Sequence, residues 1–316
     1  MSVADRLKIL AGNAHRALGE EICAELGQPL GSASVGKFPD GEIDVKINDD
    51  IRGADVFIVQ PTCPPVNDNL VELLLMIDCC LRASADRVTA VIPYFGYARK
   101  DRKDEGRVPI SAKMCANMIS AAGANRVLTL DLHASQIQGF FDIPVDHLFA
   151  KPVLCEYFKD LNLEDVTLVA PDVGSIRMAR AYASSIGADL AIVDKRRHSA
   201  KSTSVEHLIG DVEGSEVVIV DDMISTAGSI TEAAKTVKKM GARNVYIGAT
   251  HAVLCGEAVR KLDEAPVQEV VVTNTIPVPE EKRLDKIRVL SVAPLLARAI
   301  DRIHRSASVS ALFNED

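Results

Sequence analysis

The chain has 316 residues, of which 47% are hydrophobic and 4% aromatic, and it contains no Trp. Its formal net charge of −8 argues against nucleic acid as the default partner. There is no signal pattern and no apolar run of about eighteen residues, so we expect a soluble cytoplasmic protein without a membrane partner. The seven Cys residues have no C-x-x-C spacing, which indicates small buried side chains in a reducing compartment.

The first half of the chain alternates short apolar runs with amphipathic segments. Strands are predicted over 6–10, 35–47 with a Pro-Asp-Gly turn inside it, 55–60, 87–93 and 126–132. Helices are predicted over 15–26, 69–84 and 111–122. This alternation is typical of α/β domains in which helices flank a mostly parallel sheet.

The second half repeats the pattern of the first. Residues 7–27 align with a segment ending at Gly187, and Leu10 then falls on Val169 and Asn13 on Asp172. Later positions keep an offset of 158 to 161 residues. We infer a duplication, with one α/β domain over 1–150 and a second over 151–300.

The segment 216–240 carries the clearest chemical pattern. Val217–Val220 reads as a buried strand, Asp221 and Asp222 follow it, and an amphipathic helix is predicted from Ser229. Its buried face is predicted to contain Ile230, Ala233, Ala234, Val237 and Met240. A loop entering a helix N-terminus suits a phosphate, and a carboxylate pair suits a vicinal diol.

This pattern predicts a site for a pentose 5-phosphate, the alternative being an ordinary solvated turn. The chain has neither a Walker A loop nor a G-x-G-x-x-G fingerprint. In the first copy, Gln60-Pro61-Thr62 stands where the second has the acidic pair. We therefore expect only the second copy to keep the sugar-phosphate site.

Other polar groups fall beyond the carboxyl ends of predicted strands, where open parallel sheets bind ligands. They are His133, Asp172, Lys195-Arg196-Arg197, and the segments 38–42 and 99–107. Each has a structural alternative: a satisfied histidine, a helix N-cap at Asp172, or solvated charge runs. Two dense basic clusters in an acidic chain nevertheless indicate several phosphates, and Mg²⁺ with them. Together these features suggest phosphoryl-type transfer from a nucleotide.

At this point the chain resembles a known family, ribose-phosphate diphosphokinase, also called phosphoribosyl pyrophosphate synthetase. The matching strings are FPDGE (38–42), DLHASQIQGFFDIPVDHL (131–148), APDVG (170–174), VDKRR (193–197), VDDMISTAG (220–228), VVVTNTIP (270–277) and SVSALF (308–313). They cover nearly the whole length in the family's order.

The resemblance implies two phosphoribosyltransferase-like domains, with the tail from about 300 to 316 packed back on the first. It implies an enzyme that transfers the diphosphoryl group of ATP to the anomeric hydroxyl of ribose 5-phosphate for nucleotide biosynthesis. Dimers grouped into a homohexamer, with inorganic phosphate and ADP as effectors, are also implied.

The resemblance further implies residue roles. ATP is expected on Asp40, Gly41, Glu42, Arg99 and Lys100, and Mg²⁺ at His133 and Asp172. Ribose 5-phosphate is expected on Asp221, Asp222, Ser225, Thr226, Ala227, Gly228 and Ser229. Lys195 and Arg197 are expected on a catalytic flap, and the effectors on Arg52, Ser84, Arg107, Ser308 and Phe313.

The chain departs from the family pattern in several places. Lys100 replaces Gln, Ser225 replaces Asp, and Ser229 replaces Thr. The flap lacks the Asn and Glu that usually follow the basic triplet. In the effector site, Asp50 and Gly106 replace Ser, and Asp50 places a negative charge where phosphate is expected.

Two other readings compete with an active diphosphokinase. A phosphoribosyltransferase shares the VDDMISTAG type of loop but normally has one copy of the domain and no FPDGE. A non-catalytic regulatory partner subunit should have lost catalytic residues, whereas His133, Asp172, Lys195, Arg197 and the acidic pair are all present.

Overall fold

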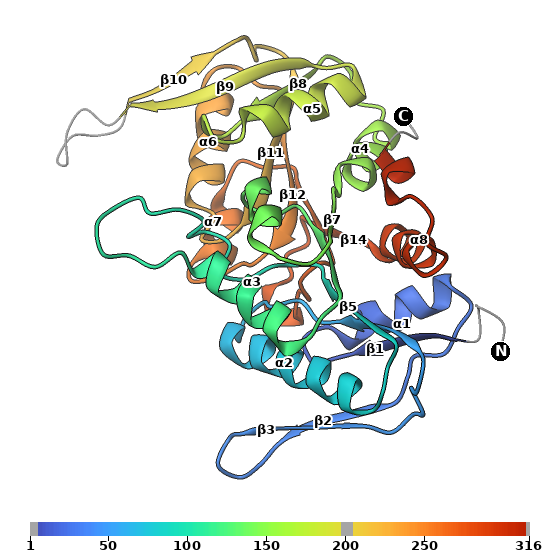
Figure 1. The fold of residues 1–316 in the computed structure, drawn as a ribbon. Helices are drawn as coiled ribbons and strands as arrows, with labels where there is room; N and C mark the ends of the chain where they lie inside the picture. The colour runs from blue at the N-terminus through green and yellow to red at the C-terminus, as the bar shows by residue number, and fades with distance from the viewer. Residues whose placement is uncertain (1–5, 197–204, 314–316) are drawn as a thin grey trace. The chain divides into compact units, whose positions relative to one another are not determined.

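The computed structural model describes residues 6–196 and 205–313. These residues divide into two compact units (Figure 1). Unit 1 contains the chain up to Phe149, then Thr275–Pro277, and the chain from Ser291 onward. Unit 2 contains Ala150–Asn274 and Val278–Leu290.

Unit 1 is built on a parallel sheet of five strands in the order β1-β4-β5-β6-β7. Its strands are β1 (Leu7–Ala11), β2 (Ala33–Lys37), β3 (Ile43–Ile47), β4 (Asp55–Val59), β5 (Arg87–Ile92), β6 (Arg126–Leu130) and β7 (Val145–Leu148). Its helices are α1 (Arg16–Glu25), α2 (Val66–Arg82), α3 (Ser111–Ala122), α8 (Ala293–His304), and the 3₁₀ turns η2 (Ser135–Phe140) and η4 (Val309–Phe313). The strands β2 and β3 form a separate antiparallel hairpin.

Unit 2 has a seven-stranded sheet in the order β10-β9-β8-β11-β12-β13-β14. Its strands are β8 (Val166–Ala170), β9 (Asp189–Arg196), β10 (Val205–Ile209), β11 (Glu216–Ile224), β12 (Asn244–Ala252), β13 (Glu269–Thr273) and β14 (Ile287–Leu290). Its helices are α4 (Lys151–Asp160), α5 (Ile176–Ile186), α6 (Gly228–Lys239), α7 (Ala258–Glu264), and the 3₁₀ turn η3 (Glu280–Lys282). Only the β9–β10 pair is antiparallel.

The two sheets share one topology. The strand order β1-β4-β5-β6-β7 in unit 1 corresponds to β8-β11-β12-β13-β14 in unit 2. In both units an antiparallel pair of strands is inserted between the first and second strands of the series. The predicted α/β class and the duplication are therefore confirmed.

Alternation of apolar side chains along the strands builds the core of unit 2. Val217 and Ile219 belong to a cluster with residues of α6 and α7. Val218 and Val220 belong to a second cluster with residues of α4 and α5. Because successive strand residues point to opposite faces, the continuous apolar run requires helices on both sides of the sheet.

Two helices belong to a different unit from the strand that precedes them in the chain. Helix α4 follows β7 of unit 1 but packs on α5 in unit 2, and α8 follows β14 of unit 2 but packs on α1 in unit 1. The pair α1 and α8 is visible in blue and dark red in Figure 1. No helix among the described residues combines the length and apolar character needed to cross a membrane.

Three details of the predicted elements were wrong. Strand β11 does not end before the acidic pair but runs to Ile224, because the parallel ladder with β12 continues beyond Val220. Likewise β9 extends through Lys195 and Arg196, which pair with β10 instead of following the strand. Met240 is not on the buried helix face: α6 ends at Lys239, and Met240 is 48% exposed at its C-cap.

Candidate active site

The loop Ser225–Ala227 joins β11 to α6 at the carboxyl edge of the unit 2 sheet. Ala227 has a left-handed backbone (φ 59°) at the N-cap position, and no described side chain caps the helix. Thr231 Oγ donates a 2.7 Å hydrogen bond to the Ala227 carbonyl, which fixes the turn. The first amides of a helix have no partner within it and carry the positive end of its dipole. The local geometry therefore suits an anion.

Asp221 and Asp222 are consecutive residues near the end of β11, and their carboxyl groups lie within hydrogen-bond reach of each other. Asp221 accepts a 3.0 Å hydrogen bond from the Asp222 amide. Burial, with the neighbouring charges of Asp222 and Asp172, raises the pKa of Asp221 to about 8. Such an acidic site favours a ligand that brings hydroxyl donors or positive charge.

Asp172 lies two residues beyond β8, the strand adjacent to β11. Its Oδ1 accepts hydrogen bonds from the amide of Ser175 at 3.0 Å and from its hydroxyl at 3.2 Å. Ser175 is the N-cap residue of α5, so Asp172 is not the N-cap. Its hydrogen bonds stabilise the turn that precedes the helix. Its charge nevertheless acts on Asp221, which puts both carboxylates at one edge of the sheet.

The flap begins as a β-hairpin. Lys195 pairs with Glu206, and Arg196 with Val205, in the antiparallel ladder of β9 and β10. Arg197 lies outside the described residues, as do the other residues of the stretch 197–204.

The predicted ATP residues Asp40, Gly41 and Glu42 are exposed at the tip of the β2–β3 hairpin in unit 1. Asp40 Oδ1 accepts a 3.1 Å hydrogen bond from the Glu42 amide, and Gly41 has φ +96°, a conformation that favours glycine. Phe38, which belongs to the selected segment 38–42 but was assigned no role of its own, is 50% exposed beside them.

Arg99, Lys100 and His133 also belong to unit 1. Arg99 is exposed in the turn that follows β5. Lys100 Nζ lies 2.7 Å from a carboxylate oxygen of Asp104, and this hydrogen bond raises the pKa of Lys100. His133 is exposed in the short loop between β6 and η2.

The structure brings two predicted effector residues together. Arg52 donates a 3.1 Å hydrogen bond to the Ser84 hydroxyl. Asp50 Oδ1 accepts a 3.1 Å hydrogen bond from the backbone amide of Arg52, so this carboxylate shapes the local turn. Arg107 is exposed, with φ 64°, and Ser308 is exposed just before η4.

The last predicted effector residue, Phe313, closes η4. Its side chain lies outside the described part of the structure. The grouping of the effector residues remains a prediction from the resemblance.

Unit 1 fills the place that corresponds to the acidic site of unit 2. Asn13 and Gln60 are the counterparts of Asp172 and Asp221. Both contact Glu72, whose carboxylate accepts hydrogen bonds from the Asn13 amide at 2.5 Å and from Gln60 Nε2 at 3.0 Å. Glu72 is only 5% exposed and Gln60 is fully buried. Buried side chains thus occupy the first copy's position, as expected if only the second copy keeps the sugar-phosphate site.

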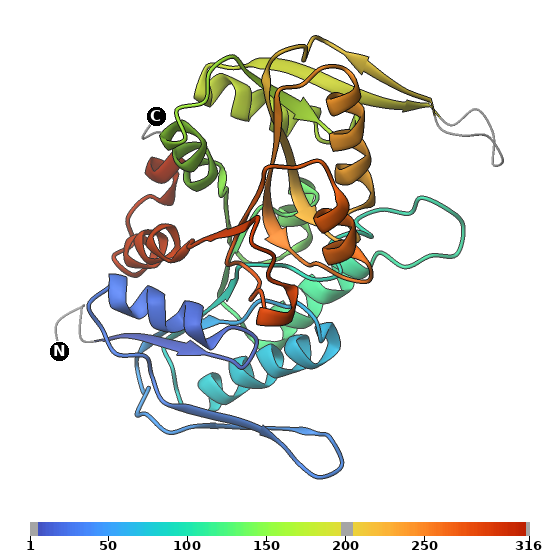
Figure 2. The ribbon, with the colours of Figure 1, turned by 180° about the vertical axis from the view of Figure 1, so that it is seen from behind.

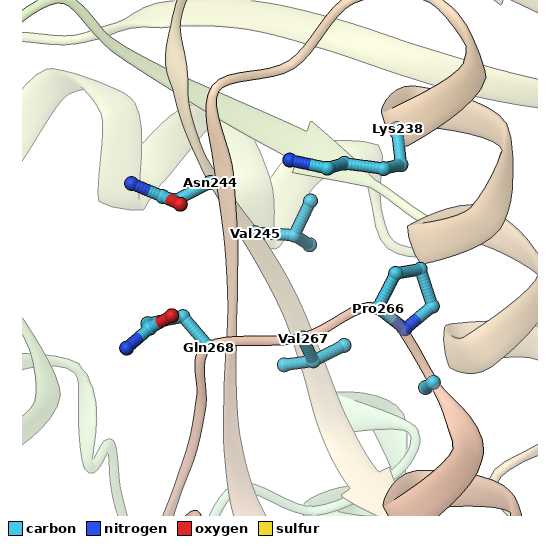
Figure 3. Close-up of a pocket in the computed structure, with 7 residues that line it drawn as sticks. Lys238, Asn244, Val245, Pro266, Val267 and Gln268 are labelled. Atoms are coloured by element: carbon cyan, nitrogen blue, oxygen red, sulfur yellow. The ribbon is translucent and has the colours of Figure 1, made fainter.

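A pocket of about 230 Å³ lies at the opposite edge of the unit 2 sheet (Figure 3). It is lined at the amino ends of β12 and β13 by residues that include Lys238, Asn244 and Gln268. Lys238 Nζ donates to two backbone carbonyls, at 2.6 and 3.1 Å, and Asn244 Nδ2 donates to Glu216 at 3.2 Å. Lys238 and Asn244 are thus already paired, and the pocket lies at the edge of the sheet opposite Asp221 and Asp172, so it is not the candidate active site.

Comparisons with known proteins identify two matching family models. Residues 7–123 match the N-terminal domain of ribose phosphate pyrophosphokinase, and residues 196–314 match the phosphoribosyl synthetase-associated domain. The ribose-phosphate pyrophosphokinase of Rhodopirellula baltica is 57% identical over 312 residues, which are 98% of this chain and 99% of the relative.

Two further relatives are similar over most of their length. The Helicobacter pylori ribose-phosphate pyrophosphokinase is 51% identical over 97% of this chain and 96% of its own. The crystal structure of phosphoribosylpyrophosphate synthetase from Mycobacterium smegmatis matches with a TM-score of 0.90 and 40% identity. That match covers 96% of this chain and 100% of the other.

Proposed function

The chain belongs to the ribose-phosphate pyrophosphokinase family, and from this premise we propose its reaction and the role of each site residue. The protein transfers the diphosphoryl group of ATP to the anomeric hydroxyl of ribose 5-phosphate, giving 5-phosphoribosyl 1-pyrophosphate and AMP. The observation that carries this function is the near full-length identity above 50% to curated relatives. The acidic strand end and phosphate loop of unit 2 support it.

Ribose 5-phosphate binds at the carboxyl edge of the unit 2 sheet. Its phosphate accepts hydrogen bonds from the first amides of α6 and from the exposed hydroxyls of Thr226 and Ser229. Asp221 and Asp222 accept hydrogen bonds from the ribose hydroxyls. Binding of these donors offsets the cost of burying the carboxylate of Asp221.

ATP binds through residues of unit 1. The exposed ring of Phe38 offers a stacking surface for adenine, and Asp40 and Glu42 offer acceptors for its amino group. Arg99 and Lys100 bind phosphate oxygens. Lys100 is already paired with Asp104, and a phosphate would share its ammonium with that carboxylate or replace it.

The donor set of unit 2 fits Mg²⁺, which prefers carboxylate oxygens and retains several waters. In the described part of the chain, no three His, Cys, Asp or Glu side chains form a group that could hold a metal by themselves. This fits an ion held by one or two protein groups and by substrate phosphates. We assign Asp172 of unit 2 to it, and His133 of unit 1 keeps the metal-associated role that the family resemblance implies. When bound, Mg²⁺ supplies neutralisation of phosphate charge.

Transfer of a diphosphoryl group requires alignment of two substrates and stabilisation of charge on equatorial oxygens. Lys195 and Arg197 provide that stabilisation from the flap, one as a point charge and the other as a bidentate fork. The antiparallel pairing of β9 with β10, which places Lys195 at the end of β9, supports this assignment.

The protein assembles as a homohexamer of three dimers, and inorganic phosphate and ADP act through the Arg52 region. The Arg52–Ser84 hydrogen bond supports a preformed anion contact there. Asp50 Oδ1 accepts a hydrogen bond from the backbone amide of Arg52, which leaves the Arg52 guanidinium available to an anion, with the negative charge of Asp50 opposing it. Cytoplasmic location follows from this metabolic role.

The test is release of AMP from ATP and Mg²⁺, measured with and without ribose 5-phosphate and over a range of inorganic phosphate concentrations. AMP that forms only with the sugar phosphate is the expected result. Activity that requires phosphate would support the effector site, whereas full activity without phosphate would count against it. No AMP under any condition would favour a non-catalytic partner subunit.

A further inference from the structure

Lys261 directs its ammonium group toward the phosphate loop from the neighbouring helix α7. Gly228 is the first residue of α6, and a Cβ built on it would lie 3.9 Å from Lys261 Nζ. The same point lies 3.9 Å from Thr226 Oγ, and apart from the backbone of α6 itself no other non-adjacent described atom is within 4 Å. Figure 2 shows α6 and α7, both in orange, side by side. An ammonium and a hydroxyl therefore converge on the open space beside Gly228.

The ammonium of Lys261 has no protein partner within the described residues. Two nearby acidic residues, Glu257 and Glu264, are paired with Arg260. Arg260 lies 3.0 Å from Glu257 and 2.8 Å from Glu264. The charge of Lys261 is thus available to a ligand, and the side chain is only partly exposed.

The segment that leads into α7 is fastened to the phosphate loop. The amide of Leu254 donates to the Ile224 carbonyl and that of Cys255 to the Ser225 carbonyl, both at 2.9 Å. The Cys255 sulfur also lies 3.2 Å from the Ser225 hydroxyl. These contacts fix the start of α7 relative to the loop and hold Lys261 in place.

We propose that Lys261 binds the 5-phosphate of the sugar substrate, completing with Thr226 and the α6 amides a cradle of positive charge. The inference deepens the proposed function and rests on it. Lys261 then gives the site its preference for a phosphorylated pentose over the free sugar. No resemblance to a motif marks this residue, because it lies over thirty positions beyond the phosphate loop.

The test compares Lys261→Met, which keeps the length of the side chain but removes its charge, with Lys261→Arg. A matched control is Lys235→Met on α6, where the ammonium lies 2.8 Å from Glu232. The measurements are KM for ribose 5-phosphate, KM for ATP, and kcat, with Tm recorded for each variant.

A lost charge-assisted hydrogen bond corresponds to about a 10- to 100-fold weaker affinity. Lys261→Met should raise KM for ribose 5-phosphate by about that factor while kcat, KM for ATP and Tm stay near wild type. Lys261→Arg should restore most of the affinity, and Lys235→Met should change none of these values.

An active Lys261→Met enzyme with an unchanged KM for the sugar phosphate would overturn the inference and leave the proposed function intact. A fall in Tm without a KM change would assign Lys261 a structural role and overturn it equally. Failure of the proposed function is a separate result, since it would appear as absence of AMP formation in the wild type.

Discussion

The imidazole Nδ1 of His304 lies 2.7 Å from a carboxylate oxygen of Asp55, although 249 positions separate them in the chain. Both side chains are nearly buried, at 6% and 11% exposure. Arg87 Nε donates to the other Asp55 oxygen at 2.7 Å, and its guanidinium also donates to the Ile303 carbonyl at 3.1 Å. The end of α8 is therefore held on unit 1 by a charged network at the amino ends of β4 and β5.

Asp55→Asn should destabilise unit 1, because it removes the negative charge that the Arg87 guanidinium and the His304 ring share. Loss of one member of a buried ion pair costs about 3–5 kcal/mol, and the partial exposure of Arg87 reduces the expected value to about 2 kcal/mol. The measurement is Tm by calorimetry. The control Asp301→Asn removes an exposed pair with Arg305 and should shift Tm by far less. Equal shifts would mean that the network contributes no more than a surface pair.

The fold could be predicted from the sequence to a large extent because it depends on local patterns. Helix α3 was predicted with its observed limits, Ser111–Ala122, since an amphipathic period and a following glycine define both ends. The limits of β11 could not be predicted, because Asp221 and Asp222 end the apolar run while the ladder with β12 continues. Pairing partners far along the chain decide where a strand ends.

The same distinction between local sequence patterns and packing of distant residues applies to the candidate site. Asp221, Asp222 and the hydroxylated loop could be identified because they are contiguous and follow a buried strand. Lys261 could not, because only the packing of α7 beside α6 brings its ammonium to the loop. The Glu72 network was also not foreseen, since it joins three distant polar residues that have no local pattern.

Lys195→Ala should lower kcat far more than it raises KM for either substrate. Cationic contacts made in the transition state of phosphoryl transfer are worth roughly 10³–10⁵ in rate. Steady-state kinetics with both substrates varied would separate the two parameters. A rise in KM alone would instead make Lys195 a ground-state binding residue.

Asp221→Asn should raise Tm, and more so at high pH. Some acidic groups have a higher pKa in the folded chain than in the unfolded chain. Their contribution to the free energy of unfolding is fully present below the unfolded-state pKa and is lost as pH rises through the folded-state pKa. For Asp221 these values are 3.8 and about 8, so wild-type stability falls across that window. The variant side chain cannot ionise, so its stability does not fall in this way. The Tm of the variant minus that of the wild type, measured by calorimetry, should therefore increase from about pH 5 to about pH 9. An advantage that stays constant with pH would show that Asp221 does not titrate in this window. The same variant should lose ribose 5-phosphate affinity.

Gly228→Ala should impair sugar phosphate binding without harming the fold. The backbone of Gly228 is not in the left-handed region, and the added methyl would meet only Lys261 and Thr226, both at an ordinary contact distance of 3.9 Å. Replacing glycine at such a helical position stabilises a protein by about 0.4–1 kcal/mol, so Tm should stay level or rise.

The methyl would nevertheless occupy the space assigned to the phosphate, and KM for ribose 5-phosphate should rise by about tenfold or more, as measured by AMP release. Gly248→Ala on β12 is the matched contrast. Its Cβ would lie 2.9 Å from the ring of Phe158, so that variant should lose stability by about 1–3 kcal/mol through overpacking of the core. If Gly228→Ala kept both its Tm and its sugar phosphate KM, the phosphate would have to bind away from the space between Thr226 and Lys261.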